Sequence, residues 1–129
     1  MTRNRETIRA AIYCRVARAN DLEMESQQES MLRYARNLGY DNITVYSDNG
    51  ASGATVDRPA FNRLNTAMLA GKYDVVLVKD VSRISRNFIT AERWLDVAST
   101  LDVVVMSPLE AGGVMNRFRR MKFSNLVIC

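Results

Sequence analysis

The sequence contains no histidine, and cysteine occurs only twice in 129 residues. Without imidazole, the chain has neither histidine-based acid–base catalysis nor a histidine-ligated metal. Cys14 lies within an apolar run and Cys129 is the last residue, so their number and spacing predict no disulfide framework and no zinc site. We therefore expect no metal and no cofactor, and chemistry that rests on hydroxyls, carboxylates, tyrosines or arginines.

Long apolar runs are also missing. No stretch approaches the roughly 20 apolar residues that span a bilayer, and residues 1–7 lack the pattern of a signal peptide. The sequence thus predicts a soluble, cytoplasmic protein with no membrane partner. A chain of 14.6 kDa fits one domain, which buries roughly two thirds of its unfolded surface.

Charge is distributed unevenly along the chain. Residues 1–112 carry 14 basic and 14 acidic side chains, so the net charge of +4 comes from four basic residues after Gly112. Of the 18 basic residues 15 are arginines, which favours planar contacts with phosphate or carboxylate groups. We expect an anionic partner, a domain over residues 1–112 and a basic tail over residues 113–129.

Four apolar segments have the length and composition of buried strands. They are residues 8–16, 43–46, 75–78 and 103–106. Between them lie segments in which apolar residues recur at helical spacing. This alternation predicts an α/β domain of three layers, in which helices flank a mostly parallel sheet of about four or five strands.

The ends of the helices can be predicted from single residues. The first helix carries an apolar stripe that includes Met24 and Met31 and ends at Gly39. Asp57 is expected to cap the second helix, which enters through Pro59 and stops at Gly71. Further expectations are helix starts near Ser26 and Ser85, a helix-surface Ser30, and core positions for Phe88 and Trp94.

Polar segments follow three of the predicted strands. Arg15 and Ala17 lie at the end of the first strand, residues 48–53 follow the second, and residues 80–86 follow the third. In open α/β sheets, sites form beyond the carboxyl ends of the strands. We therefore expect these segments to converge on one edge of the sheet.

Five segments occur in one characteristic order. They are the strand 8–16, the amphipathic segment with Ser26, Gln27 and Gln28, the polar loop 46–53, the segment 57–64, and residues 80–87. Together they resemble the catalytic domain of the serine recombinases, the resolvase and invertase family, over roughly residues 8–108. The resemblance implies a resolvase-like fold, DNA as the partner, and site-specific strand exchange.

In that family a serine attacks the scissile DNA phosphate, and arginines neutralise the charge that builds on the phosphate oxygens without a metal. The nucleophile position of the family matches Ala17. Its arginines and its polar helix residue match, in chain order, Arg15, Gln28, Arg58, Arg83 and Arg86. The resemblance also implies a homo-oligomer, a dimer that becomes a tetramer in the active complex.

Two departures from the family pattern affect the chemistry. Alanine has no lone pair, so Ala17 cannot form the covalent link, and the chain is expected to be inactive as written. Many family members have Asp where this chain has Ser82, which can hydrogen-bond a phosphate but cannot ionise. On a strand, Asp80 would share the face of Ser82. The phosphate-binding role is therefore expected for Arg15, Arg58, Ser82, Arg83 and Arg86.

Other readings of the sequence remain open. No recognisable DNA-binding module follows residue 112, which leaves a non-catalytic pseudo-recombinase partner as one alternative. A flavodoxin-like module that binds a phosphorylated ligand is another. The loop 48–53 matches neither common nucleotide-binding glycine pattern, and its glycines indicate a mobile loop. Ser52 in that loop is expected to serve the turn rather than to act as a nucleophile.

Overall fold

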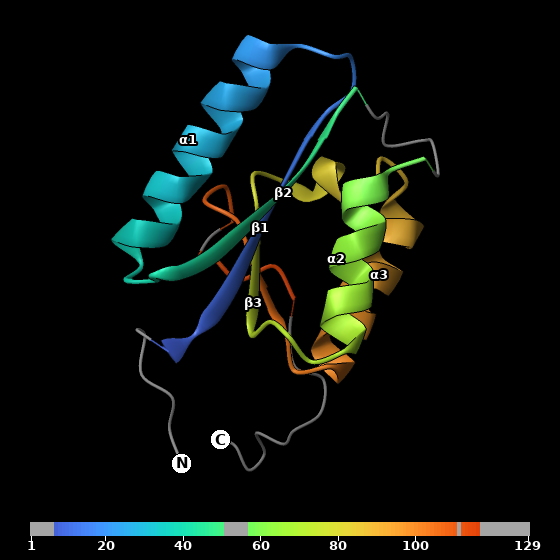
Figure 1. Cartoon of the computed structure of the whole chain (residues 1–129). Helices are drawn as coiled ribbons and strands as arrows, with labels where there is room; N and C mark the ends of the chain where they lie inside the picture. Colours follow the sequence, from blue (N-terminus) through green and yellow to red (C-terminus); the bar gives the residue numbers. More distant parts are fainter. Residues whose placement is uncertain (1–6, 51–56, 111, 117–129) are drawn as a thin grey trace.

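The computed structural model describes residues 7–50, 57–110 and 112–116, and it confirms the predicted α/β fold. Four strands form one parallel sheet in the order β2-β1-β3-β4. They are β1 (Arg9–Val16), β2 (Asn42–Asn49), β3 (Val75–Val78) and β4 (Val104–Met106). Helix α1 (Asp21–Asn37) covers one face of the sheet, whereas α2 (Pro59–Leu69) and α3 (Phe88–Thr100) cover the other (Figure 1).

Strand β1 lies at the centre of the core. Ala11 and Tyr13 pack into the cluster beneath α2 and α3, while Ile12 and Cys14 pack against α1 on the opposite face. All residues of β1 after Arg9 are buried. This two-sided burial explains why the segment is almost continuously apolar rather than alternating.

Both ends of α1 are fixed by local hydrogen bonds. The side chain of Asn20 accepts a hydrogen bond from the N–H of Glu23, and Gly39 has the positive φ of 91° that favours glycine after a helix. The predicted end at Gly39 is confirmed. The predicted start near Ser26 is wrong, because the Asn20 cap begins the helix at Asp21 and leaves Ser26 exposed within it.

The start of α2 is capped from a distant residue. Arg58, and not Asp57, occupies the cap position, and its side chain makes no capping hydrogen bond. Instead the carboxylate of Asp48 accepts from the N–H groups of Ala60 at 2.9 Å and Phe61 at 3.0 Å. The capping role predicted for Asp57 is therefore wrong, while the entry at Pro59 is confirmed.

The start of α3 also differs from expectation. Asn87 caps the helix by accepting from Thr90 N–H, and Ser85 accepts from the N–H of Asn87 just before it. The prediction that Phe88 is buried is wrong, because this first residue of α3 is 73% exposed and the next, Ile89, is 60% exposed. Trp94 does pack against the core.

In the described part of the chain, no helix is long and apolar enough to cross a membrane. Within the same residues, histidine, cysteine and acidic side chains form no group of three that could hold a metal ion.

Candidate functional site

The structure brings the ends of β1 and β3 to one edge of the sheet. Pairing between these two strands stops where Tyr13 lies opposite Val78, whereas β1 continues along β2 until Val16 lies opposite Asn49. The chain leaves β1 for α1 on one face and leaves β3 for α3 on the other (Figure 1). The end of β1 is thus a switch point, where open α/β sheets place their sites.

The turn after β3 forms the wall of this site. It contains the short 3₁₀ helix η2 (Val81–Arg83), which Asp80 caps by accepting from both the N–H and the hydroxyl of Ser82. Asp80 Oδ1 also lies 3.7 Å from Arg83 Nε. Asp80 and Ser82 do lie together, but the predicted reason is wrong, because β3 ends at Val78 and a helix cap rather than a strand face joins them.

Two buried arginines hold the carbonyl groups of this turn. Arg15 donates to the carbonyls of Ser82 and Arg83, the latter at 3.1 Å. Arg58 donates to the carbonyls of Arg83 at 2.7 Å and Ile84 at 2.6 Å. Arg83 in turn donates to the carbonyl of Arg15 at 3.0 Å. Three of the four predicted arginines therefore belong to one hydrogen-bonded network.

The electrostatics of Arg15 place the fourth arginine nearby. Burial lowers the pKa of Arg15, and the positive charges of Arg58, Arg83 and Arg86 lower it further. Since such interactions decay with distance, the other three guanidinium groups lie within electrostatic range of Arg15. Arg86 is exposed, so the cluster offers positive charge to solvent at this edge. Such a site attracts anions.

Ala17 is exposed and directly follows β1, two residues after Arg15 in the sequence. The loop after β2 packs closely here: Gly50 N–H donates to the carbonyl of Val16 at 2.8 Å. A Cβ at Gly50 would come within 3.3 Å of the Ala19 side chain, and its φ of 98° favours glycine. The methyl group of Ala17 has no hydrogen-bonding or nucleophilic capacity.

The glutamine that contacts the site is Gln27, which sequence reasoning missed. Its carboxamide accepts a hydrogen bond from Arg15 N–H at 3.1 Å and donates one to Arg15 C=O at 3.2 Å. Arg15 lies beyond the part of β1 that pairs with β3. Gln28 instead binds the hydroxyl of Ser47 at the end of β2. The sequence pattern does indicate that Gln27 faces the sheet, because Gln27 lies three residues after Met24 and four before Met31, on the buried stripe of α1.

Some of the sequence predictions fall outside the described residues. Ser52 and the glycine loop after Gly50 lie there, as do the basic residues of the tail, Arg117, Arg119, Arg120 and Lys122. The first residues of the tail are described. The side chain of Asn116 accepts from Val105 N–H and donates to Ser99 and to the Val103 carbonyl, so it fastens this segment to β4 and α3.

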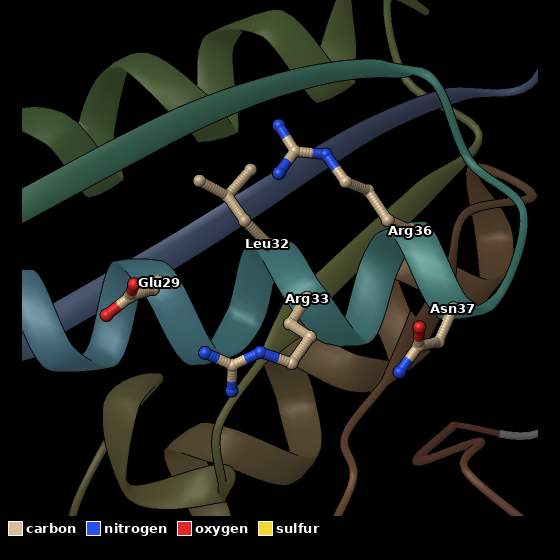
Figure 2. Close-up of a pocket in the computed structure, with 5 residues that line it drawn as sticks. All are labelled: Glu29, Leu32, Arg33, Arg36 and Asn37. Atoms are coloured by element: carbon tan, nitrogen blue, oxygen red, sulfur yellow. The ribbon is translucent and has the colours of Figure 1, made fainter.

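Among the surface grooves of the described residues, two lie on different parts of the molecule. One of about 320 Å³ borders the arginine cluster and is lined by Ser82, Arg86 and the exposed ring of Phe88, among others. A second, of about 360 Å³, lies on α1 (Figure 2). There Leu32 and Arg36 extend on the side of β2 and Arg33 on the other side. This second basic surface lies toward the C-terminal end of α1, away from Ala17.

Comparisons with known proteins agree with the geometry. The family described as "Resolvase, N terminal domain" matches residues 10–124. The N-terminal catalytic domain of TP901-1 integrase is 30% identical, with a TM-score of 0.70 over 77% of this chain and 76% of that one. The C-terminal catalytic domain of ISC1926 TnpA, an IS607-like serine recombinase, is also 30% identical, with a TM-score of 0.70 over 81% and 72%.

A third solved structure, a resolvase family site-specific recombinase from Streptococcus pneumoniae, is 29% identical, with a TM-score of 0.67 over 78% of this chain and 72% of that one. No curated protein sequence matches the chain.

Proposed function

The chain belongs to the resolvase family of serine recombinases, and from this we propose that it is a strand-exchange domain whose arginine cluster binds a DNA phosphate. In this proposal Arg15, Arg58, Arg83 and Arg86 supply the positive charge, Ser82 is a further phosphate ligand, and Gln28 is the polar helix residue of the site. Ala17 stands where the attacking hydroxyl belongs. We also propose that the protein acts in the cytoplasm.

One observation supports the proposal: Arg15 of β1, Arg58 just before α2 and Arg83 in the turn after β3 share one hydrogen-bonded network, and the charge of Arg86 also acts on Arg15. Burying Arg15 and Arg58 in one network costs desolvation energy, which their hydrogen bonds to backbone carbonyls offset. A cluster of like charges is retained most readily where a function needs it. Neutralising phosphate oxygens during transfer is such a function, and preorganised donors are worth roughly 3 kcal/mol each.

Ala17 favours a second role for the chain as it stands. A domain that binds DNA but forms no covalent link would act as a non-catalytic subunit, either with copies of itself or in mixed assemblies with active relatives. From its membership of the family we also propose that the chain forms a homo-oligomer. Residues 1–112 would then form the recombinase domain, and the basic tail 113–129 would add electrostatic attraction to DNA.

The experiment that tests the proposal restores the missing oxygen. The variant Ala17→Ser, fused to a sequence-specific DNA-binding domain and a dimerising helix, is incubated with a nicked duplex that traps cleaved strands. We expect a protein–DNA adduct that survives denaturant, disappears with protease and forms in the presence of EDTA. The unmodified chain in the same fusion is the control and should form none.

A second control separates the hydroxyl from its surroundings. Arg86 is exposed, so Arg86→Gln in the Ala17→Ser fusion should leave the fold intact and reduce adduct formation about 100-fold. An adduct from the unmodified chain would reveal another nucleophile. No adduct from the Ala17→Ser fusion, with intact DNA binding, would refute the proposed phosphate-transfer geometry.

A further inference from the structure

The exposed ring of Phe88 has no role in the core or in the site described so far. It lies at the first position of α3, and Val81 in the turn after β3 is exposed as well. Both side chains line the groove of about 320 Å³ that also contains Arg86. Single exposed apolar residues are common on protein surfaces. Apolar side chains that share one groove with polar neighbours instead indicate a contact with a ligand or a partner.

The lining of this groove combines apolar and polar groups. The apolar part consists of Val81, Phe88 and Ala91, and the polar part of Ser82, Ser85 and Arg86. The hydroxyl oxygen of Ser85 accepts from Asn87 N–H at 3.0 Å, and within the described part of the chain no group accepts the Ser85 proton. An aromatic ring, a guanidinium group and an available hydroxyl proton together suit a flat ligand with acceptors at its edge.

The charge of Arg86 indicates which flat ligand this is. Arg86 is exposed, and its charge lowers the pKa of Arg15, so the groove adjoins the proposed phosphate site. Because Arg86 and Phe88 line the same groove, a nucleotide with its phosphate on Arg86 can place its base against the ring. Proteins hold unpaired nucleotides by this combination of positive charge and aromatic stacking.

The size of the groove limits the ligand to an unpaired base. A volume of about 320 Å³ lies at the lower end of the range for small-ligand sites, roughly 300–1,000 Å³, and suits one nucleotide rather than a duplex. Taking a base out of an intact duplex costs free energy, and the cost is least for a base that is already single-stranded. Strand exchange passes through broken strands, which supply such bases.

We propose that this groove binds one unpaired DNA base, which stacks on Phe88 while its phosphate contacts the arginine cluster. The inference rests on the proposed phosphate-binding function and extends it from the phosphate to the adjoining base. Since every base has a flat face, the groove would hold a free strand without selecting its sequence. It gives a function to an aromatic side chain that the core does not use.

The test compares two single-stranded oligonucleotides that have the same length and the same phosphates. One carries thymine bases, and the other consists of abasic residues. Binding of each labelled oligonucleotide to the whole chain is measured by fluorescence anisotropy at low salt, where phosphate contacts are strongest. We expect the thymine oligonucleotide to bind about tenfold more tightly than the abasic one, because only its bases can stack.

Four variants separate stacking from charge. Phe88→Leu keeps an apolar side chain but removes the ring, so the tenfold ratio should fall to about two, whereas Phe88→Tyr keeps the ring and should preserve the ratio. Arg86→Gln removes a phosphate contact, so both oligonucleotides should bind more weakly by a similar factor while the ratio remains. Leu69→Ala is the matched control, because Leu69 is an exposed apolar residue of α2, and it should change neither affinity.

An unchanged ratio in Phe88→Leu would overturn the inference. Equal binding of the two oligonucleotides by the unmodified chain would also overturn it and would leave the groove to a protein partner. If Arg86→Gln weakens neither oligonucleotide, the proposed phosphate site fails. Loss of the ratio in Phe88→Leu would then still support a base site at Phe88, and retention of the ratio would refute it.

Discussion

Replacing Arg58 by Lys keeps the positive charge but removes the fork that holds the turn after β3. The guanidinium group makes hydrogen bonds of 2.6 Å and 2.7 Å to two carbonyls, a longer one to Tyr13, and a stack on Phe61. A lysine ammonium is a compact point charge that can satisfy one of these carbonyls at a time. Arg58 is only 6% exposed, so water does not replace the lost partner.

The cost follows from these contacts. Losing one charge-assisted hydrogen bond costs about 1.5–3 kcal/mol, and losing the stack on an aromatic ring adds roughly 0.5–1 kcal/mol. We therefore expect Arg58→Lys to lower the free energy of unfolding by about 2–3 kcal/mol. For a domain of this size the melting temperature falls by about 10 °C.

Urea and thermal unfolding followed by circular dichroism measure this loss. Arg33→Lys is the matched control, because Arg33 is an exposed arginine on α1 and its replacement should cost less than about 0.5 kcal/mol. A loss of under about 1 kcal/mol for Arg58→Lys would show that the hydrogen bonds from Arg58 to the two carbonyls contribute little to stability.

Three further predictions concern other buried groups. Gln27→Leu should cost roughly 1–3 kcal/mol of unfolding free energy in urea, because it leaves the Arg15 N–H unpaired, while Gln28→Leu should cost under about 1 kcal/mol. Burial raises the pKa of Cys14 from 9.0 to about 12, so a thiol reagent at pH 8 should modify it only after unfolding. Since the folded thiol holds its proton longer than the unfolded one, pH titration should show stability falling between pH 9 and 12. Asn116→Ala should cost roughly 3 kcal/mol in the urea assay, because it strips buried partners from β4 and α3.

The fold could be predicted where a local pattern decides the structure. The apolar run of β1 and β3 follows from burial on both faces, and Gly39 and Gly71 follow from the positive φ that their positions require. The convergence of segments at one edge follows from parallel strands. These features depend on residues close in sequence and on general rules of sheet topology.

The errors arise where contacts distant in sequence decide. The cap of α2 comes from Asp48, twelve residues before Ala60, and no local pattern distinguishes it from Asp57. The contact of Gln27 with the backbone of Arg15 is different, because the apolar stripe of α1 already indicates that Gln27 faces the sheet. The exposure of Phe88 at the first position of α3 depends on which distant segments cover that turn, and the helical spacing alone does not specify them.

The central claim is that DNA phosphate binds at the edge where β1 and β3 end. The direct measurement is an amide and guanidinium NMR titration of the unmodified chain with a short DNA duplex at low and high salt. We predict that the signals of Ala17, Arg83 and Arg86 shift, and that raising the salt concentration reverses the shifts. Shifts confined to Arg33, Arg36 and the rest of the α1 groove (Figure 2), with none at the strand edge, would contradict the account.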